Sequence, residues 1–274
     1  MKTIILIPTR NNESLIPSFF IALYNLNPQP EKFIFATNDN EDRTLELLND
    51  FQKPHEIVVI ENLDREVEKT VSIYKNIAFI RQVLLNKARF YNPDFAVFID
   101  DDVFIQSPNL LNIFTSRNLD IVGDPYLKMW PEGTYLASRW KHPTDPTLCL
   151  LRKIPRKDIE EVEMTSGGCL CLSRKVVQDT RLSFWPMNYI LERPETSEDF
   201  GYCLTAKKYG YKIWLEGTIQ LDHRVYVRGP RSRKPWTVPS QNPQPRLSAP
   251  PTITIARELF RRNWTKLKRL GRRE

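Results

Sequence analysis

The chain has 274 residues, a net charge of +7 at pH 7 and 41% hydrophobic residues, enough for a sizeable core in one large α/β domain or two small ones. No apolar run is long enough for a membrane-spanning helix, and the apolar start is too short for a signal peptide, so we expect it to form the first strand of a cytosolic protein. The four cysteines form no C-x-x-C pair, which argues against a zinc site.

Apolar segments with strand-like and helix-like spacing alternate over about the first hundred residues, which predicts a parallel sheet with right-handed crossovers. The predicted strands are 2–7, 32–36, 56–60 and 95–99. The predicted helices are 14–26, 44–51 and about 66–86.

The pattern loosens after residue 102. We expect helices at 108–115, 174–180 and 198–209, and strands at 119–122, 163–173, 211–215 and 218–221. The segment 123–157 is rich in Pro, Trp and Tyr and has no clear period, which is typical of a functional loop or binding surface.

The positive charge is concentrated at the C-terminal end. Residues 229–251 are Pro-rich and predict a linker, whereas 252–274 predict a basic amphipathic helix. Two interpretations of this helix stay open: a peripheral anchor on an anionic membrane surface, or a helix that docks on its own domain or on a second subunit in a homo-oligomer.

The chain is organised around Ala96–Val103, where four apolar residues run into Asp100, Asp101 and Asp102. Such a run predicts a strand buried on both faces, with the acids at the carboxyl end where α/β sheets bind ligands. Adjacent carboxylates repel one another, and a divalent cation such as Mg²⁺ or Mn²⁺ removes that repulsion. The alternative is an acidic turn with no ligand.

Five short segments, taken in order, resemble those of nucleotide-sugar-dependent glycosyltransferases of the GT-A fold, family 2-like and inverting, over roughly residues 2–224. The segments are Ile7–Asn12, Thr37–Asp39, Asp100–Asp102, Ser166–Cys169 and Thr196–Gly201. The resemblance implies an α/β, Rossmann-like, mixed but mostly parallel sheet flanked by helices, with the basic C-terminal helical tail appended. The glycosyltransferase domain would span 1–228, with a nucleotide-binding half at 1–103 and an acceptor-binding half at 104–228.

The resemblance also implies site residues on the donor side. The nucleotide-sugar would contact Pro8, Thr9, Arg10, Asn38, Lys75, Asp100 and Asp101. Asn38 stands where the family has an acidic residue that recognises the base. Asp100–Asp102 matches the D-x-D motif, so the resemblance assigns Mn²⁺ or Mg²⁺ to Asp102, with Asp100 and His223 as further ligands.

On the acceptor side, the resemblance implies that Gly167 and Gly168 line the site, and the aromatic Trp140 is a candidate for stacking on a sugar ring. Asp199 would be the base that deprotonates the acceptor, with Glu198 as the second candidate. The alternative for both acids is a role at a helix start, where Ser197 is a candidate N-cap.

The expected function is therefore a metal-dependent hexosyltransferase that uses a UDP- or GDP-linked sugar and an unknown glycan, lipid or protein acceptor. Inversion follows if Asp199 is the base; a retaining enzyme remains an alternative. A nucleotidyltransferase is less favoured because residues 8–13 contain no glycine. The remaining alternative is a nucleic-acid or membrane-binding module without catalysis.

Overall fold

The computed structural model describes residues 1–53, 57–63, 73–123, 127–128, 134–135, 137–138, 158–184, 197–219 and 221–223. The predicted linker at 229–251, the predicted basic helix at 252–274 and Trp140 lie outside the described residues. Within the described residues, no helix is both long and apolar enough to span a bilayer.

The described part is built on a sheet with the strand order β10-β13-β6-β12-β4-β1-β2-β3. Its strands are β1 (Thr3–Thr9), β2 (Lys32–Thr37), β3 (Val58–Asn62), β4 (Phe95–Ile99), β6 (Ile121–Gly123), β10 (Ile159–Val162), β12 (Cys169–Ser173) and β13 (Ile213–Glu216). β12 is antiparallel to both of its neighbours and β10 is antiparallel to β13, while the other pairs are parallel. The prediction of a mixed, mostly parallel sheet is confirmed.

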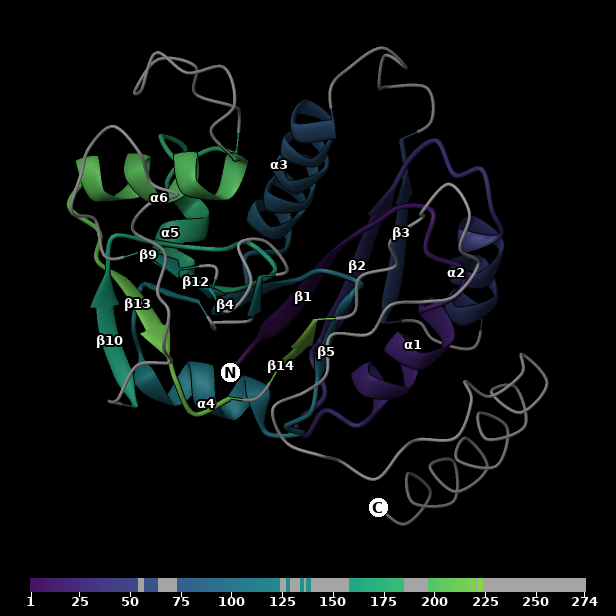
Figure 1. Ribbon diagram of the computed structural model, residues 1–274, viewed down its shortest axis with the longest axis horizontal. Helices are drawn as coiled ribbons and strands as arrows, with labels where there is room; N and C mark the ends of the chain where they lie inside the picture. Colours follow the sequence, from purple (N-terminus) through teal and green to yellow (C-terminus); the bar gives the residue numbers. More distant parts are fainter. Residues whose placement is uncertain are drawn as a thin grey trace.

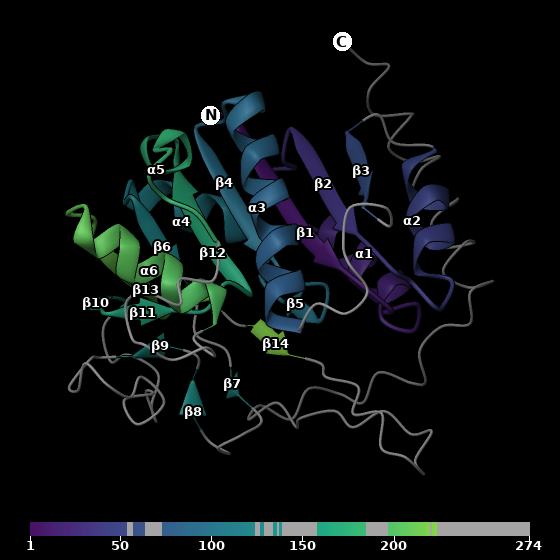
Figure 2. The same ribbon diagram turned by 90° about the horizontal axis from the view of Figure 1, so that it is seen from above.

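Helices cover both faces of this sheet (Figures 1 and 2). The helices are α1 (Ile16–Tyr24), α2 (Thr44–Gln52), α3 (Ile73–Tyr91), α4 (Leu110–Arg117), α5 (Arg174–Gln178) and α6 (Glu198–Lys208). The layer of α1, α2 and α4 packs on one face, and the layer of α3, α5 and α6 packs on the other.

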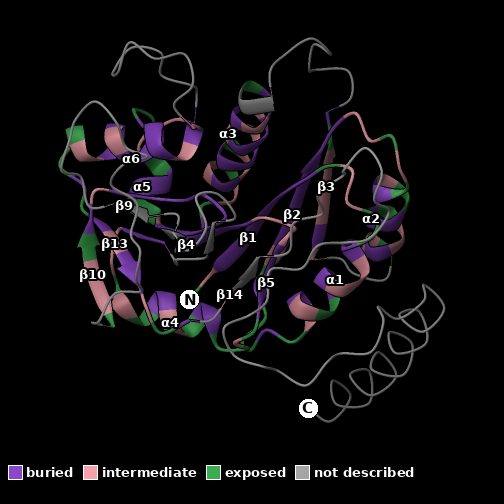
Figure 3. Cartoon of the chain, in the orientation of Figure 1, coloured by how far each residue is buried: buried purple, intermediate pink, exposed green. Residues whose placement is uncertain are grey.

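The alternation of side chains along each strand supplies both layers. In β1, Ile4 and Leu6 join the core under α3, whereas Ile5 and Ile7 join the core over α1. Figure 3 shows the central strands of the sheet buried, while the edge strands β3 and β10, the outer surfaces of the helices and the loops carry partly or fully exposed residues. A sheet covered on both faces explains the continuous apolar runs of β1 and β4.

Several elements differ from the predictions. α3 runs on to Tyr91 and not to 86, and it ends where Asn92 adopts a φ of 48° ahead of Pro93. β10 was not predicted, because its sequence Ile-Glu-Glu-Val lacks an apolar alternation. The strand predicted at 218–221 begins three residues later, as β14 (Leu221–His223).

Smaller two-stranded sheets lie beside the main sheet. β14 pairs with β5 (Val103–Ile105), which directly follows the acidic triplet. β11 (Met164–Thr165) pairs with β9 (Ala137–Ser138), and β7 (Leu127–Lys128) pairs with β8 (Thr134–Tyr135). The segment predicted as a functional loop therefore contains short strands.

Candidate active site

The acidic triplet forms the turn between β4 and β5. The Val103 amide donates to the Asp100 carbonyl at 3.0 Å, and the Asp100 amide donates to the Gly168 carbonyl at 2.9 Å. The first bond closes the turn, and the second fixes it to the residue that precedes the start of β12. The three acids are half-buried at the carboxyl edge of the sheet, the place predicted for them.

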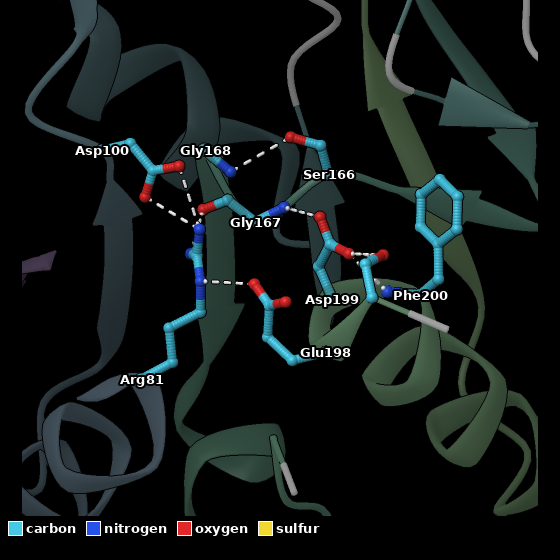
Figure 4. Close-up of polar contacts among 9 residues, drawn as sticks. Arg81, Asp100, Ser166, Gly167, Gly168, Glu198, Asp199 and Phe200 are labelled. Atoms are coloured by element: carbon cyan, nitrogen blue, oxygen red, sulfur yellow. Dashed lines mark hydrogen bonds and ion pairs between the residues drawn. The ribbon is translucent and has the colours of Figure 1, made fainter. Parts of the chain in front are cut away.

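Arg81 of α3 holds three parts of the site together (Figure 4). Its Nη2 atom donates to both carboxylate oxygens of Asp100, at 2.8 and 2.9 Å, and its Nη1 atom donates to the Gly167 carbonyl at 2.6 Å. Its Nε atom lies 3.0 Å from Oε1 of Glu198. Arg81 is 3% exposed, so these contacts form in a region of low dielectric.

Arg81 was not among the predicted site residues, although the sequence contains a signal for its role. Arg81 lies on the apolar face of α3, three residues after Ala78 and three before Leu84, and both of those residues are buried. A charged side chain on a buried helix face needs a partner of opposite charge. Asp100 and Glu198 are the acids that supply this opposite charge.

The loop between β11 and β12 needs glycine at residue 167. A Cβ atom there would lie 2.5 Å from Nη1 of Arg81 and 2.7 Å from its Cζ atom. The Gly167 amide donates to Oδ2 of Asp199 at 2.9 Å, and the Gly168 amide donates to Oγ of Ser166 at 3.1 Å. The close approach of the loop to Arg81 explains the small residues predicted to line the site.

Glu198 and Asp199 begin α6, as predicted, but the capping differs. Ser197 occupies the N-cap position without a capping bond, and its hydroxyl donates instead to Oδ1 of Asp199. The same oxygen accepts the Phe200 amide at 2.8 Å. Asp199 is therefore held by bonds to both oxygens while it stays half-exposed.

Glu198 is 5% exposed and turned towards Arg81. Burial, and to a lesser degree the charge of Asp199, raise the pKa of Glu198 from 4.5 to about 7, although Arg81 opposes the shift. The two neighbouring acids thus have different surroundings: Glu198 is enclosed with a counter-charge, and Asp199 stands at the edge.

Asp101 is directed towards the protein. Its Oδ2 atom and the Oγ1 atom of Thr9 are both shielded from solvent, and neither has a partner in good hydrogen-bond geometry. Burial and the neighbouring charges of Asp102 and Asp100 raise the pKa of Asp101 well above its usual range, although the amide of Asn12 lowers it. Asp101 is thus largely enclosed by the protein, and its contact with a nucleotide-sugar stays a prediction.

Asn38 is fully buried at the end of β2, and its role at a base stays a prediction. Its amide forms a reciprocal pair with Asn76, at 3.1 and 3.2 Å, and also donates to Oδ2 of Asp39 at 3.0 Å. Asp39 is half-exposed with a φ of 46°. A carboxylate beside a buried amide pair therefore occupies the edge that the sequence assigned to Asn38.

The other predicted donor residues lie at the same edge with different exposures. Pro8 and Thr9 are buried at the end of β1, whereas Arg10 and Lys75 are exposed. His223 pairs with Val103 through the antiparallel β14–β5 ladder, so its backbone lies next to the acidic turn.

A divalent ion fits this site if a substrate completes its coordination. Among the side chains that the structure describes, no three His, Cys, Asp or Glu residues form a metal-binding group. Mg²⁺-type ions at phosphate-transfer sites take one or two protein carboxylates and fill the remaining positions with water and phosphate oxygens. Asp102, half-exposed at the turn, fits that mode and not a closed protein cage.

No family model and no curated protein sequence matches the chain. Solved structures do match in fold: the crystal structure of GalNAc-T7 with UDP, GalNAc and Mn²⁺ has a TM-score of 0.56 at 12% identity, over 81% of this chain and 44% of that one. S. aureus TarS has a TM-score of 0.54 at 17% identity, over 81% of this chain and 36% of that one. TarS 1–349 in complex with UDP-GlcNAc has a TM-score of 0.54 at 16% identity, over 81% of this chain and 57% of that one.

These matches show that the chain has the GT-A type of glycosyltransferase fold. The chain spans between 36% and 57% of the length of the three matched chains. The fold predicted from the sequence is confirmed.

Proposed function

We propose that the protein is a metal-dependent glycosyltransferase that moves a hexose from a UDP- or GDP-linked donor to a hydroxyl acceptor with inversion. One observation carries the proposal: Arg81 joins the acidic turn at Asp100 to the acidic helix start at Glu198, at the carboxyl edge of a GT-A sheet. The solved structures with UDP-GlcNAc and with UDP, GalNAc and Mn²⁺ support a nucleotide-sugar donor and a divalent ion.

On the donor side, Asp102 would hold Mn²⁺ or Mg²⁺, with His223 as a further ligand. The bound ion supplies positive charge to the diphosphate that leaves as the glycosidic bond breaks. Asp100 is already paired with the guanidinium of Arg81, so its role is to fix the acidic turn. Asp39, half-exposed at the end of β2, replaces Asn38 as the candidate for contact with the base.

On the acceptor side, Asp199 takes the proton from the attacking hydroxyl. Its Oδ2 atom accepts the Gly167 amide, so the base and the glycine loop keep a fixed relative position. A base that activates the acceptor for direct displacement gives inversion at the anomeric carbon. Glu198 is enclosed by the protein and paired with Arg81, which leaves Asp199 the better placed of the two.

The test is a panel of UDP- and GDP-linked hexoses incubated with Mn²⁺, with mixed hydroxyl acceptors, followed by NMR of the product anomer. Asp102→Ala should abolish metal-dependent nucleotide binding. Asp199→Asn should keep that binding and lower transfer by about 10²- to 10⁴-fold, the usual contribution of a general base. Normal transfer by Asp199→Asn, or a product with retained configuration, would remove the assignment of the base.

A further inference from the structure

Asn12 connects three loops at the carboxyl edge of the sheet. Its backbone amide donates to Oγ1 of Thr44, the first residue of α2, at 2.7 Å. Its carbonyl accepts the amides of Leu15 and Ile16 at the start of α1, each at 3.0 Å. Its Nδ2 atom donates to the Asp101 carbonyl at 3.3 Å, so the same residue also contacts the acidic turn.

The neighbouring residues of this loop contact α2 and its preceding loop but reach no further. Oδ1 of Asn11 accepts the Glu41 amide at 2.7 Å, and the Asn11 amide donates to Asn40 at 3.0 Å. Oε2 of Glu13 accepts the Arg43 amide at 2.9 Å. Of the side-chain hydrogen bonds described above for this loop, the one from Nδ2 of Asn12 to the Asp101 carbonyl reaches the acidic turn.

We propose that Asn12 is a positioning residue that couples the binding of a divalent ion to the binding of a nucleoside diphosphate. The inference rests on the proposed function, which places the ion at the β4–β5 turn and the nucleotide at the loops after β1 and β2. The bond from Asn12 fixes the acidic turn relative to the loops that bind the nucleotide. The ion therefore binds to a turn that is already ordered next to the diphosphate. Without the link, part of the binding free energy is spent on ordering the turn.

The coupling is the factor by which Mn²⁺ tightens the binding of UDP or GDP, and it is measured from two titrations. Asn12→Ala and the near-isosteric, uncharged Asn12→Leu both remove the Nδ2 donor while they keep the backbone bonds. Since one hydrogen bond of this kind contributes little more than about a factor of three to ten, the coupling factor should fall about three- to ten-fold in both variants.

Glu13→Ala is the matched control, because it breaks a bond from the same loop to Arg43, ahead of α2, without touching the acidic turn. Its coupling factor should equal that of the wild type. A wild-type factor in Asn12→Ala, or an equal fall in Glu13→Ala, would overturn the inference.

A second measurement uses the protein without ligand, so that failure of the inference and failure of the proposed function can be told apart. The Val103 amide closes the acidic turn on the Asp100 carbonyl, and its hydrogen exchange reports the turn directly. Exchange at Val103 should be faster in Asn12→Ala than in Glu13→Ala. Equal exchange contradicts the inference, whereas a wild type that binds neither UDP nor GDP with Mn²⁺ contradicts the proposed function.

Discussion

At the scale of single residues, Arg81 determines how the acids of the site are arranged. One guanidinium lies against Asp100, the Gly167 carbonyl and Glu198, and its Cζ atom is 5.9 Å from the centre of the Phe98 ring. The fork of donors in arginine suits this arrangement, and the point charge of lysine does not. Arg81 therefore stabilises the fold and the site together.

Replacing Arg81 with Met should lower the free energy of unfolding by about 3–5 kcal/mol, because Glu198 and Asp100 would lose their buried counter-charge. Urea unfolding followed by circular dichroism measures this loss. The double variant Arg81→Met, Glu198→Gln should recover part of it, since it removes one of the unpaired charges. A single variant as stable as the wild type would contradict the role given to Arg81.

Gly167→Ala should destabilise the protein by about 1–3 kcal/mol, because the new methyl group displaces the Arg81 guanidinium from a locked position. Gly201→Ala is the matched control in α6, where an added Cβ meets no atom within 4 Å. That control should be neutral or stabilising by up to about 1 kcal/mol, since alanine favours helix. The melting temperatures of both variants measure this difference. Equal melting temperatures would show that a methyl group at residue 167 does not displace Arg81.

The raised pKa of Glu198 predicts how stability depends on pH. The folded protein binds the Glu198 proton more tightly than the unfolded chain does, with a pKa of about 7 against 4.5. This contribution to stability is complete below about pH 4.5 and is lost as the pH rises through 7. Relative to Glu198→Gln, the wild type should lose stability between pH 5 and pH 8 in urea unfolding, and parallel profiles would contradict the shift.

Single residues were predicted well where a run of neighbours identified them. The acids at 100–102 directly follow an apolar strand, and the acids at 198–199 begin a helix. Their places could therefore be predicted from the neighbouring residues. Asn38 and Arg81 could not be placed in that way. Each depends on partners far away in the chain, such as Asn76 for Asn38 and Glu198 for Arg81, which no local pattern reveals.

At the scale of elements, the short β5–β14 ladder brings the end of the described chain back to the acidic turn. Its register is Leu221 with Ile105, Asp222 with Phe104 and His223 with Val103. The ladder is the feature that gives the predicted ligand His223 its place beside the turn.

Asp222→Pro should break this ladder, because proline has no amide hydrogen and fixes φ. We expect weaker Mn²⁺-dependent nucleotide binding with little change in nucleotide binding without metal, since the main sheet does not include β14. Isothermal titration with UDP and GDP, with and without Mn²⁺, measures both. Unchanged metal dependence would show that the ladder does not position a ligand of the ion.

Elements with a strong apolar period were predicted to within a few residues, as β4 at 95–99 and α2 at 44–52 show. β10 and β5 were missed for physical reasons. β10 pairs with β13 alone and carries Glu160 and Glu161 in its middle, and β5 has only three residues, too few to show a period.

At the scale of the whole molecule, a layer of helices packs on each face of the sheet. The candidate site lies at the carboxyl edge of that sheet. Three segments meet at that edge: the acidic turn, the glycine loop and the start of α6. Together they span residues 100–199 of the chain. Because the sequence resembles its structural matches at only 12% to 17% identity, the layers and the strand order carry the likeness in fold.

The account depends on a divalent ion held by the acidic turn together with the diphosphate of a sugar donor. Anomalous scattering from crystals that contain Mn²⁺ and UDP or GDP tests it most directly. We expect a manganese peak about 2.1 Å from a carboxylate oxygen of Asp102, with the diphosphate on the other side of the ion. A bound nucleotide with no manganese at Asp102, or manganese bound away from this turn, would contradict the account.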